Sequence, residues 1–507
     1  MKIVFVHKGR EHLGIEWISA MLKQAGHEVA LVYDPGLFSH HDNLLHMPAL
    51  AARFDRTDAV VEEVIDHRPD MIAMGIYTDT YAWARGVARR VREQLETVIV
   101  MGGIHASLAP ETVVADGAAD YVVVGEGEAP MVDLAAMVAA GERRTDIANV
   151  WCRRDGRTIA NPLRPPISLD SLPLIDKSLF EDHIRFRDDY MILTDRGCPF
   201  SCTFCCEATM RGMYGSGYLR RRSIPHVMHE LRTYKRRYKY REVMFFDSVF
   251  FTDKTWLREL LTAYRKEIAV PFRCEGHVQL MDADIAGMLA ESGCYTVDFG
   301  LQTINQQVRR ELLDRRETNE QLAQALELCE KVGLKYDVDL ILDLPGQSQE
   351  DFEQTAAFFA GSRRLNRLKF FNLTLFPGTP IVDRLHAAKL LSDSDLRRVK
   401  SGEMIGDFYH ESSLEGRVRD RSKKGIKFLL RGLPLLPAKT VHRLLVHRRY
   451  RRLGYLPGGT GLLLQLLVAL KNRDLRYVIH GRRLLFSIIT ELRRRRRGPR
   501  QAGASST

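Results

Sequence analysis

Short apolar runs alternate with helical stretches through the first four hundred residues, and this alternation limits the chain to a few folds. The runs are rich in β-branched residues, which favours strands, and each spacer is long enough for a helix. Parallel strands need crossovers of this length, whereas antiparallel strands are joined by short turns. We therefore expect an α/β protein with helices on both faces of its parallel sheets and ligand sites at the carboxyl ends of its strands.

The alternation occurs as two separate series. The first predicts a doubly wound, Rossmann-like (flavodoxin-like) domain over residues 1–148. Prolines between Asn161 and Pro173 stiffen the chain and forbid helix, which predicts a linker over residues 149–185. The second series predicts a partial (β/α)6 barrel over residues 186–400, with its first strand at Tyr190–Thr194.

Residues 401–507 lack this alternation and are expected to form helices, followed by a disordered tail after Arg493. The formal net charge of the chain is +11, but residues 411–500 hold 24 Lys and Arg against five acidic residues. The basic surplus therefore belongs to this region alone. Few aromatic residues accompany the arginines and no RNA-binding motif is present, so we expect no nucleic-acid partner.

The apolar stretches are too short for export or for crossing a membrane. The longest, Leu462–Leu470, has nine residues and contains Gln465, whereas a bilayer span needs about 20. The first residues contain only four apolar side chains in a row, too few for a signal peptide. We expect a cytoplasmic protein, in which the eight cysteines are thiols or metal ligands rather than disulfides.

The most specific motif is a cysteine loop, Cys198-Pro-Phe-Ser-Cys202-Thr-Phe-Cys205, directly after the first strand of the second series. Thiolates at this spacing converge on one small iron–sulfur cluster. A zinc site would need a fourth ligand from a second Cys or His pair, which the sequence lacks. Three ligands leave one iron of a four-iron cluster open to a substrate or cosubstrate.

This loop, placed after a first barrel strand, resembles the radical S-adenosylmethionine (SAM) superfamily. The resemblance implies that Cys198, Cys202 and Cys205 hold a [4Fe-4S] cluster, that the open iron binds SAM, and that Phe204 lies near the adenine. It also implies reductive cleavage of SAM to a 5′-deoxyadenosyl radical, with an electron from an external flavodoxin or ferredoxin. Cys206 has no role that the resemblance assigns.

Three further strand ends resemble SAM-binding motifs of this superfamily, each with a departure. Asp247 stands where relatives often have two acidic residues. Gln302 replaces a usual Glu, and its neutral amide hydrogen-bonds without charge assistance. Pro345 and Gly346 follow the fifth strand, where Asp343 replaces a usual Gly. For each segment, a purely structural turn is the alternative.

Glycine-rich segments end two strands of the first series. Because glycine lacks a Cβ, a flat ligand can approach the backbone there. The segments and the domain order resemble those of cobalamin-binding domains fused to radical SAM barrels. The resemblance implies a set of cobalamin-binding residues, with Thr78 near the nucleotide tail of the cofactor: Thr78, Gly102, Gly103, His105, Gly125, Glu126 and Gly127.

The sequence departs from those cobalamin proteins that replace the cofactor's own base with a histidine. They carry Asp-x-His-x-x-Gly after the first strand, whereas here Glu11 adjoins His12 and the glycine is Gly14. We therefore expect His12 to be a polar loop residue rather than a cobalt ligand. A doubly wound domain that holds nothing is the alternative reading.

Together the two resemblances imply an enzyme: a cobalamin-dependent radical SAM methyltransferase (class B) acting on an unactivated carbon of a hydrophobic, lipid-like or natural-product small molecule. A cyclase or oxidative rearrangement without methyl transfer is the alternative in the same superfamily. A non-catalytic iron–sulfur redox protein is disfavoured, since electron-transfer clusters usually have four protein ligands.

Two stretches of the basic region, Gly461–Lys471 and Arg482–Leu492, are rich in Leu and flanked by Arg. This composition fits helices that lie on an anionic lipid surface. A solvated basic surface is an equal alternative. Peripheral membrane contact is thus a hypothesis for this region.

Overall fold

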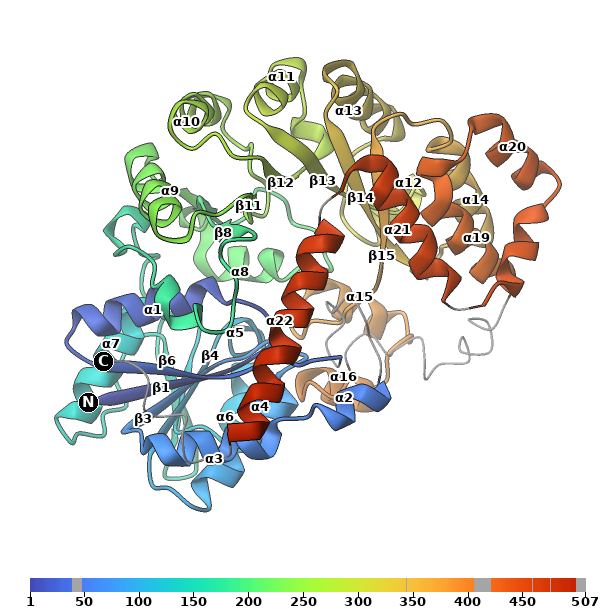
Figure 1. The fold of residues 1–507 in the computed structure, drawn as a ribbon. Coiled ribbons are helices and arrows are strands. Elements are labelled where there is room, and N and C mark those ends of the chain that lie inside the picture. The colour runs from blue at the N-terminus through green and yellow to red at the C-terminus, as the bar shows by residue number, and fades with distance from the viewer. Residues whose placement is uncertain (39–47, 343, 405–420, 458, 475, 498–507) are drawn as a thin grey trace.

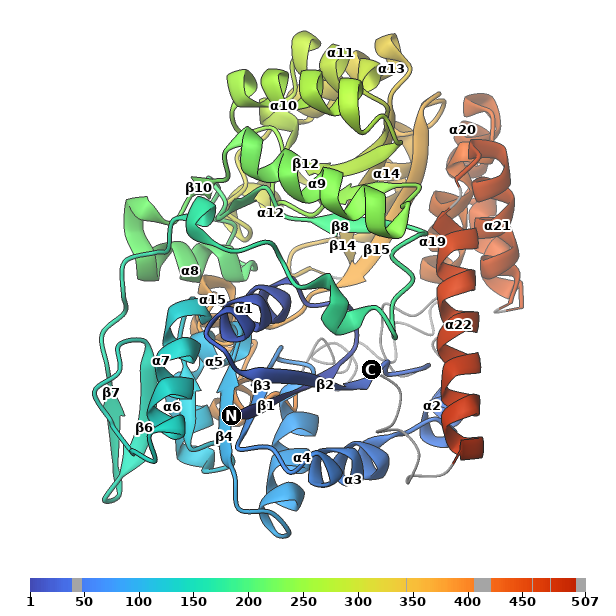
Figure 2. The ribbon, with the colours of Figure 1, turned by 60° about the vertical axis from the view of Figure 1, so that its left-hand side comes forward.

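The computed structural model describes residues 1–38, 48–342, 344–404, 421–457, 459–474 and 476–497. Two sheets with helices packed against them follow one another along the chain (Figure 1). A group of carboxyl-terminal helices lies along one side of both (Figure 2). The alternation predicted an α/β chain of two units, and the structure has this architecture.

The first sheet has the strand order β2-β1-β3-β4-β5-β6-β7. Its first five strands are parallel, as predicted, with helices on both faces. β1 is buried along most of its length, which explains its continuous apolar sequence. The parallel strands are β1 (Lys2–Lys8), β2 (Glu28–Asp34), β3 (Met71–Gly75), β4 (Val98–Gly102) and β5 (Tyr121–Val123). The helices are α1 (Leu13–Gln24), α2 (Pro48–Arg53), α3 (Thr57–His67), α4 (Tyr81–Arg92), α5 (Ile104–Leu108), α6 (Pro110–Asp116) and α7 (Glu128–Ala139).

A hairpin extends this sheet into the stretch predicted as linker. β6 (Val150–Arg154) pairs antiparallel with β5, and β7 (Arg157–Ala160) pairs with β6. Asp155 and Gly156 form the turn, both with positive φ (51° and 77°), which is the backbone that a two-residue hairpin requires. The prolines that suggested the linker begin only after β7.

The second sheet has six parallel strands in the order β15-β14-β13-β12-β11-β8. Its edges, β8 and β15, do not pair, so the barrel is partial, as predicted. The strands are β8 (Tyr190–Ile192), β11 (Val243–Phe245), β12 (Phe272–Gly276), β13 (Cys294–Gln302), β14 (Lys335–Leu342) and β15 (Leu365–Asn372), and a small antiparallel pair joins β9 (Asp195–Arg196) to β10 (Arg220–Arg221).

Helices follow the barrel strands. Most of them bury their apolar sides in one large core that includes Tyr264, Leu289 and Leu326, and α12, α15 and α16 pack in a smaller cluster around Ile381. Hydrogen-bonding caps begin many of them; Thr318 and Gln321, for example, form a capping box. These helices are α8 (Cys206–Tyr214), α9 (Ile224–Tyr238), α10 (Lys254–Glu267), α11 (Ala283–Glu291), α12 (Gln306–Glu311), α13 (Asn319–Val332), α14 (Gln349–Phe358), α15 (Pro380–Ala387) and α16 (Asp393–Lys400).

The basic region is helical, as expected: α19 (Arg421–Gly432), α20 (Ala438–Val446), α21 (Thr460–Asn472) and α22 (Arg476–Arg497), with a 3-10 segment at Arg449–Tyr455. The predicted start of a disordered tail after Arg493 is wrong, because α22 continues to Arg497; residues 498–507 lie outside the described part of the chain.

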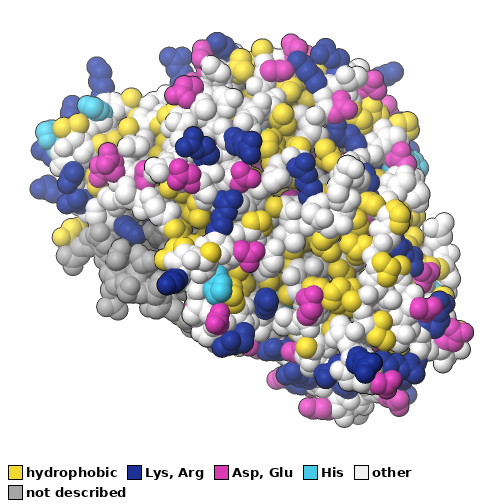
Figure 3. Space-filling view, turned by 180° about the vertical axis from the view of Figure 1, so that it is seen from behind, with side chains coloured by type: hydrophobic (Ala, Val, Ile, Leu, Met, Phe, Trp, Pro, Cys, Tyr) yellow, Lys and Arg dark blue, Asp and Glu magenta, His cyan; other side chains and the backbone are white. Residues whose placement is uncertain are grey.

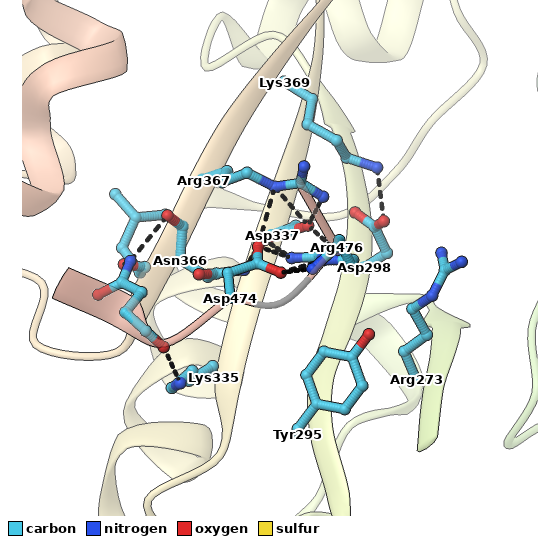
Figure 4. A network of polar contacts seen from close by, with 12 residues as sticks. Arg273, Tyr295, Asp298, Lys335, Asp337, Asn366, Arg367, Lys369, Asp474 and Arg476 are labelled. Atoms are coloured by element: carbon cyan, nitrogen blue, oxygen red, sulfur yellow. Dashed lines mark hydrogen bonds and ion pairs between the residues drawn. The ribbon is translucent and has the colours of Figure 1, made fainter. Parts of the chain in front are cut away.

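α22 crosses from the barrel to the first domain (Figure 1). At its beginning, Arg476 donates to Asp337 of β14 (2.7 Å) and to Asp474 (2.6 Å), and Arg367 of β15 also donates to Asp337 (2.7 Å; Figure 4). Near its end, Glu491 pairs with Arg56 at the start of α3 (3.0 Å). Buried ion pairs at both ends therefore attach α22 to both domains.

Candidate active site

The cysteine loop lies at the carboxyl end of the barrel, between β9 and α8. Thr203, inside the loop, donates its hydroxyl hydrogen to the carbonyl of Leu312 (2.6 Å) and accepts at its own carbonyl from the backbone of Ile381 (3.0 Å). Gly197 precedes the loop with φ +98°, and a Cβ there would lie 2.8 Å from the carbonyl oxygen of Tyr218. These contacts define the path of the backbone that carries the three predicted ligands.

The three thiols are close enough to influence one another. Burial raises the pKa of Cys198 to about 12, and the charges of Glu207, Cys202 and Cys205 add to the shift. A hydrogen bond from Cys206 lowers the pKa of Cys205. Iron binding would therefore have to displace protons from buried thiols.

No three His, Cys, Asp or Glu side chains in the described residues are close enough to hold one metal ion. This spacing does not conflict with a cluster, because the ligands of a cluster bind different iron atoms and stand further apart than the ligands of one ion. The donor set of three thiolates on one loop fits iron–sulfur chemistry.

Arg315 is a charged neighbour of the loop that contacts one of the three cysteines directly. Its side chain is nearly fully buried and donates to Cys202 Sγ (3.5 Å) and to the carbonyl of Gly300 on β13 (2.5 Å). It also pairs with Glu317 (2.6 Å) and contacts His277 (3.0 Å). A single guanidinium thus connects the cysteine loop with the carboxyl ends of β12 and β13.

A cavity of about 300 Å³ lies between the two domains. The first domain forms one wall with the carboxyl ends of β3, β4 and β5 and with α1. The barrel forms the facing wall with residues next to the cysteine loop: Leu193, Asp195 to Gly197, and Glu207. Apolar side chains such as Trp17, Ile18 and Met210 form much of the lining. Both domains therefore contribute to a single site.

The cavity wall fits a flat ligand. It contains Gly102, Gly103, Gly125 and Gly127, all of them predicted cobalamin residues. A Cβ on Gly103 would lie 3.0 Å from the carbonyl oxygen of Ile76, and one on Gly125 would lie 2.0 Å from the Tyr214 hydroxyl. In the barrel wall, which faces these glycines, one carboxylate oxygen of Glu207 has no hydrogen-bond partner. Amide groups at the edge of a corrin could donate to such oxygens.

Glu126, also predicted to bind cobalamin, lines the cavity and joins the domains. Arg196, two residues before Cys198, pairs with Glu126 (3.1 Å) and with Glu128 (2.5 Å). Arg220 donates to Glu126 (3.2 Å), whose backbone N–H donates to the Tyr214 hydroxyl (2.7 Å). Ion pairs thus connect the glycine-rich segment after β5 with the residues that precede the cysteine loop.

The structure does not bring Thr78 and His105 to the cavity. Thr78 is 1% exposed and His105 is fully buried. Nδ1 of His105 lies 3.2 Å from the Thr78 hydroxyl, and its ring packs on Tyr81. Burial lowers the pKa of His105 to about 4, so its imidazole is neutral near pH 7. In their place Ser107 lines the cavity and accepts from the backbone N–H of Gly125 (2.8 Å).

His12 lies in the cavity wall as the N-cap of α1, rather than in a free loop. Burial and the nearby His7 lower its pKa to about 3, so the ring is neutral. Its Nδ1 accepts a hydrogen bond from the backbone N–H of Ile15 (3.2 Å), which places the remaining ring proton on Nε2. A protonated Nε2 offers no lone pair to a metal, and the expected lack of an axial histidine stays a prediction.

The predicted SAM residues gather at the carboxyl end of the barrel but do not line the cavity. Phe204 packs against the cluster around Val308 and Ile341. Gln302 ends β13 with φ +69°, and its side chain folds back over Gly300. Pro345 and Gly346 form a turn that Gln347 ties to Thr303 (3.1 Å). Asp343 lies outside the described residues.

Asp247 is fully buried and holds the backbone before the cysteine loop. Its carboxylate accepts from the N–H groups of Thr194 (2.6 Å) and Asp195 (2.8 Å) and from the Thr194 hydroxyl (2.9 Å). Burial and the adjacent Asp247 raise the pKa of Asp195 to about 9. Asp247 therefore supports the site from behind, and its predicted contact with SAM stays a prediction.

Several residues at this site were not among the sequence predictions. Arg196 and Glu207 flank the cysteine motif, so their position in the sequence was a usable signal. Arg315, Ser107 and Tyr214 reach the site through tertiary contacts that no local pattern announces.

Two family models match the chain, one over most of each sheet. The B12 binding domain matches residues 8–135, and the Radical SAM superfamily matches residues 192–359. The cysteine loop and the glycine-lined cavity lie within these ranges.

Curated relatives match most of the chain. An uncharacterized methyltransferase of Pyrococcus horikoshii is 26% identical over 355 residues, covering 68% of this chain and 75% of its own. The hopanoid C-3 methylase of Methylococcus capsulatus is 25% identical, covering 68% and 63%. The anaerobic magnesium-protoporphyrin IX monomethyl ester cyclase of Rubrivivax gelatinosus is 24% identical, covering 59% and 55%.

Solved structures share the fold. The cobalamin-dependent SAM radical enzyme OxsB, with aqua-cobalamin and SAM bound, superposes with a TM-score of 0.66 at 11% identity, covering 97% of this chain and 83% of its own. The radical SAM methyltransferase TsrM of Kitasatospora setae, with cobalamin and a [4Fe-4S] cluster bound, gives 0.61 at 18% identity, covering 77% and 75%.

The fold and the two matched domains define a radical SAM enzyme with a B12-binding domain. The chain belongs to the cobalamin-binding radical SAM enzymes, whose cofactors are a [4Fe-4S] cluster, SAM and cobalamin, and methyltransferases are among its relatives.

Proposed function

We propose that this enzyme methylates an unactivated carbon of a largely apolar small molecule. The observation that carries the proposal is the shared cavity, in which glycines of the first domain face the segment that leads into the cysteine loop. A ligand bound on the glycine side would lie directly below the barrel. When bound, the cluster supplies the electron that cleaves SAM, and cobalamin carries the methyl group.

The two walls of the cavity hold different cofactors in this proposal. We assign Cys198, Cys202 and Cys205 to the cluster and the glycines at the ends of β4 and β5 to cobalamin. Arg315 donates to Cys202 and so bears on the electronic state of a bound cluster. The lining of Trp17, Ile18 and Met210 excludes water from the space between the walls.

Apolar groups at the mouth of the barrel support an apolar substrate. Phe246, directly after β11, is 44% exposed, and Phe371, near the end of β15, is 46% exposed. Two exposed aromatic rings at strand ends are unusual in a water-facing surface and are typical of a ligand site. The hopanoid methylase among the relatives supports the same substrate class.

We propose that the electron comes from an external protein of flavodoxin or ferredoxin type. Outside Cys198–Cys206 the cysteines of the sequence stand singly, at positions 152, 274, 294 and 329, and form no second closely spaced motif. An internal relay through a second cluster therefore has no support here.

An anaerobic assay tests the proposal. The protein is reconstituted with iron, sulfide and cobalamin and incubated with SAM and dithionite, and 5′-deoxyadenosine and S-adenosylhomocysteine are measured. We expect both products, since radical formation and methyl transfer each consume SAM. 5′-Deoxyadenosine alone, with cobalamin bound, would favour the cyclase alternative, for which the Rubrivivax relative is the precedent. Neither product from a protein with an intact cluster would contradict the proposal.

A further inference from the structure

The carboxyl-terminal helices expose an unusual amount of apolar surface. Eleven of the seventeen large apolar side chains exposed on the described residues lie between Val446 and Leu492. Figure 2 shows α20, α21 and α22 along one side of the molecule. We call this surface the carboxyl-terminal face; it comprises Val446, Tyr455, Leu456, Leu463, Leu466, Leu467, Leu470, Val478, Leu485, Ile489 and Leu492.

The exposed leucines of α21 form one stripe. Leu463, Leu466, Leu467 and Leu470 are spaced by three and four residues, so they share one side of the helix. The opposite side is occupied: Val468 and Ala469 are buried, and α21 packs on α19 and β15. α22 repeats the pattern with Val478, Leu485, Ile489 and Leu492. The inner sides of both helices pack against the rest of the protein, and the outer apolar stripes are exposed to solvent.

The charges around these stripes have one sign. Residues 421–497 contain only two acids, Asp474 and Glu491, and both are buried in ion pairs. In the described part of this segment the exposed charged side chains are therefore basic, among them Arg443, Arg448, Arg449, Arg451, Arg452, Lys471, Arg473, Arg482 and Arg493. Seen from behind, Lys, Arg and His side chains lie at the left-hand edge, on the side of α20, and basic and acidic side chains are mixed over the rest of this face (Figure 3).

Apolar stripes bordered by cations match the two layers of a phospholipid monolayer, acyl chains below and phosphates above. A nucleic acid would use the arginines but leave the leucines in water. None of the described helices is long and apolar enough to cross a bilayer alone; Arg449–Tyr455 and Thr460–Asn472 qualify only as a pair bent by 115°. A helix that lies on the surface satisfies these observations.

We propose that the carboxyl-terminal face docks on an anionic phospholipid membrane, with α21 inserted to the depth of its leucine stripe. The enzyme would then be a peripheral protein of the cytoplasmic membrane surface. The docking does not depend on SAM or cobalamin, so it stands or falls separately from the proposed methyl transfer.

Vesicle flotation with the full-length protein tests the docking. Vesicles of phosphatidylcholine with 30% phosphatidylglycerol are compared with vesicles of phosphatidylcholine alone, in about 50 and 500 mM salt. We expect at least tenfold more protein on the anionic vesicles at low salt, and a loss of most of this excess at high salt. Absence of binding at low salt, or equal binding to neutral vesicles, would overturn the proposal.

Two matched variants identify the surface. L467Q/L470Q removes two leucines of the α21 stripe, and V332Q/L390Q removes two other exposed apolar side chains, which belong to the barrel domain (39% and 46% exposed). We expect binding to fall at least fivefold in the first and to stay unchanged in the second, with unchanged circular dichroism in both. A stripe that mediates self-association would instead give a dimer that L467Q/L470Q dissociates in sedimentation, with no vesicle binding. That outcome, or binding of RNA without vesicles, would contradict the proposal.

Discussion

Arg315 is the residue through which the barrel acts on the cysteine loop. Its guanidinium donates to Cys202 Sγ, and a positive charge at this position favours the reduced, more negative state of a bound cluster. We expect Arg315→Gln to lower the midpoint potential of the cluster by roughly 60 mV, which is a tenfold change for one electron. Redox titration followed by electron paramagnetic resonance measures this shift.

The neighbouring Arg316 provides the control. Its side chain is 81% exposed and lies at the far end of a 3.9 Å contact with Asp314. We expect Arg316→Gln to leave the midpoint potential of the cluster unchanged. An equal shift in both variants would show that Arg315 acts only through the overall charge.

The cysteine assignment predicts a difference between adjacent residues. Replacing Cys198, Cys202 or Cys205 by Ala should remove most of the iron and the cluster absorbance, because each supplies one of three ligands. Cys206→Ala should keep both, although Cys206 lies beside Cys205 and hydrogen-bonds to it. Iron and sulfide analysis after anaerobic reconstitution measures the outcome, and loss of the cluster in Cys206→Ala would show that the ligand assignment is wrong.

The cysteine loop could be predicted because its chemistry is encoded in a local spacing. Arg315 could not, since it contacts Cys202 across 113 positions of sequence. Thr78 and His105 lie at strand ends as the sequence suggested, but the packing of His105 on Tyr81 turns both away from the cavity. Which side of a loop faces a ligand is decided by tertiary packing, not by the motif.

At the scale of elements, the turn between β4 and α5 shapes the cavity wall. Gly103 has φ +96°, and a Cβ there would also approach the backbone of Ile76 to 3.0 Å. We expect Gly103→Ala to weaken cobalamin binding by roughly tenfold, because the backbone must shift by a few tenths of an ångström and a positive φ costs about 1–2 kcal/mol for alanine. Equilibrium dialysis with cobalamin measures the affinity.

Gly117→Ala separates the strain of a positive φ from the close approach of a Cβ to the backbone of Ile76. Gly117 also has a positive φ (73°), at the end of α6, but nothing lies within 4 Å of its Cβ position. We expect Gly117→Ala to lower the thermal stability of the protein about as much as Gly103→Ala does, and to leave cobalamin binding intact. A loss of affinity in both variants would assign the effect to general destabilisation instead.

The hairpin β6–β7 is the element that the sequence analysis missed, because it placed a linker there. Asp155-Gly156 is a strong hairpin signal, and the flanking residues Val150–Arg154 and Arg157–Ala160 suit strands. The prolines that follow pointed to a linker, and the linker was placed too early. The parallel strands were easier to predict because they are buried on both faces and read as continuous apolar runs.

At the scale of the whole molecule, the attachment of α22 depends on charge. Burial alone would raise the pKa of Asp474, but the hydrogen bonds and charges of Arg476 and Arg367 outweigh it and lower the pKa to about 2. The unfolded value is about 3.9. A lowered folded pKa contributes stability above the unfolded value, and this contribution is lost as the pH falls through about 4 to 2.

We therefore expect Asp474→Asn to destabilise the protein at pH 7 by about 3–5 kcal/mol, since Arg476 loses a buried partner. The difference from the unmodified protein should shrink as the pH falls from 4 toward 2. Urea unfolding at pH 7, 4 and 3 measures it. Asp284→Asn, at a carboxylate whose side chain is 62% exposed, is the control and should change stability by less than about 1 kcal/mol. A pH-independent difference for Asp474→Asn would refute this account.

The two-domain architecture and the helical basic region could be predicted because alternation and composition record them directly. The path of α22 could not. Its inward side chains, Arg476 and Arg483, are as basic as its outward ones, and only the partners Asp337 and Asp189, far away in sequence, distinguish the two sides.

The ion pair between Arg56 and Glu491 joins two segments that are more than 400 residues apart in a chain that a ribosome makes in order. Domains fold as units during synthesis, the first-made first. Both sheets precede α22 in the chain and can form before it emerges, with Arg196 paired to Glu126 and Glu128 across the two domains. α22 then adds ion pairs to both domains away from the cavity, whose described lining contains no residue of this helix.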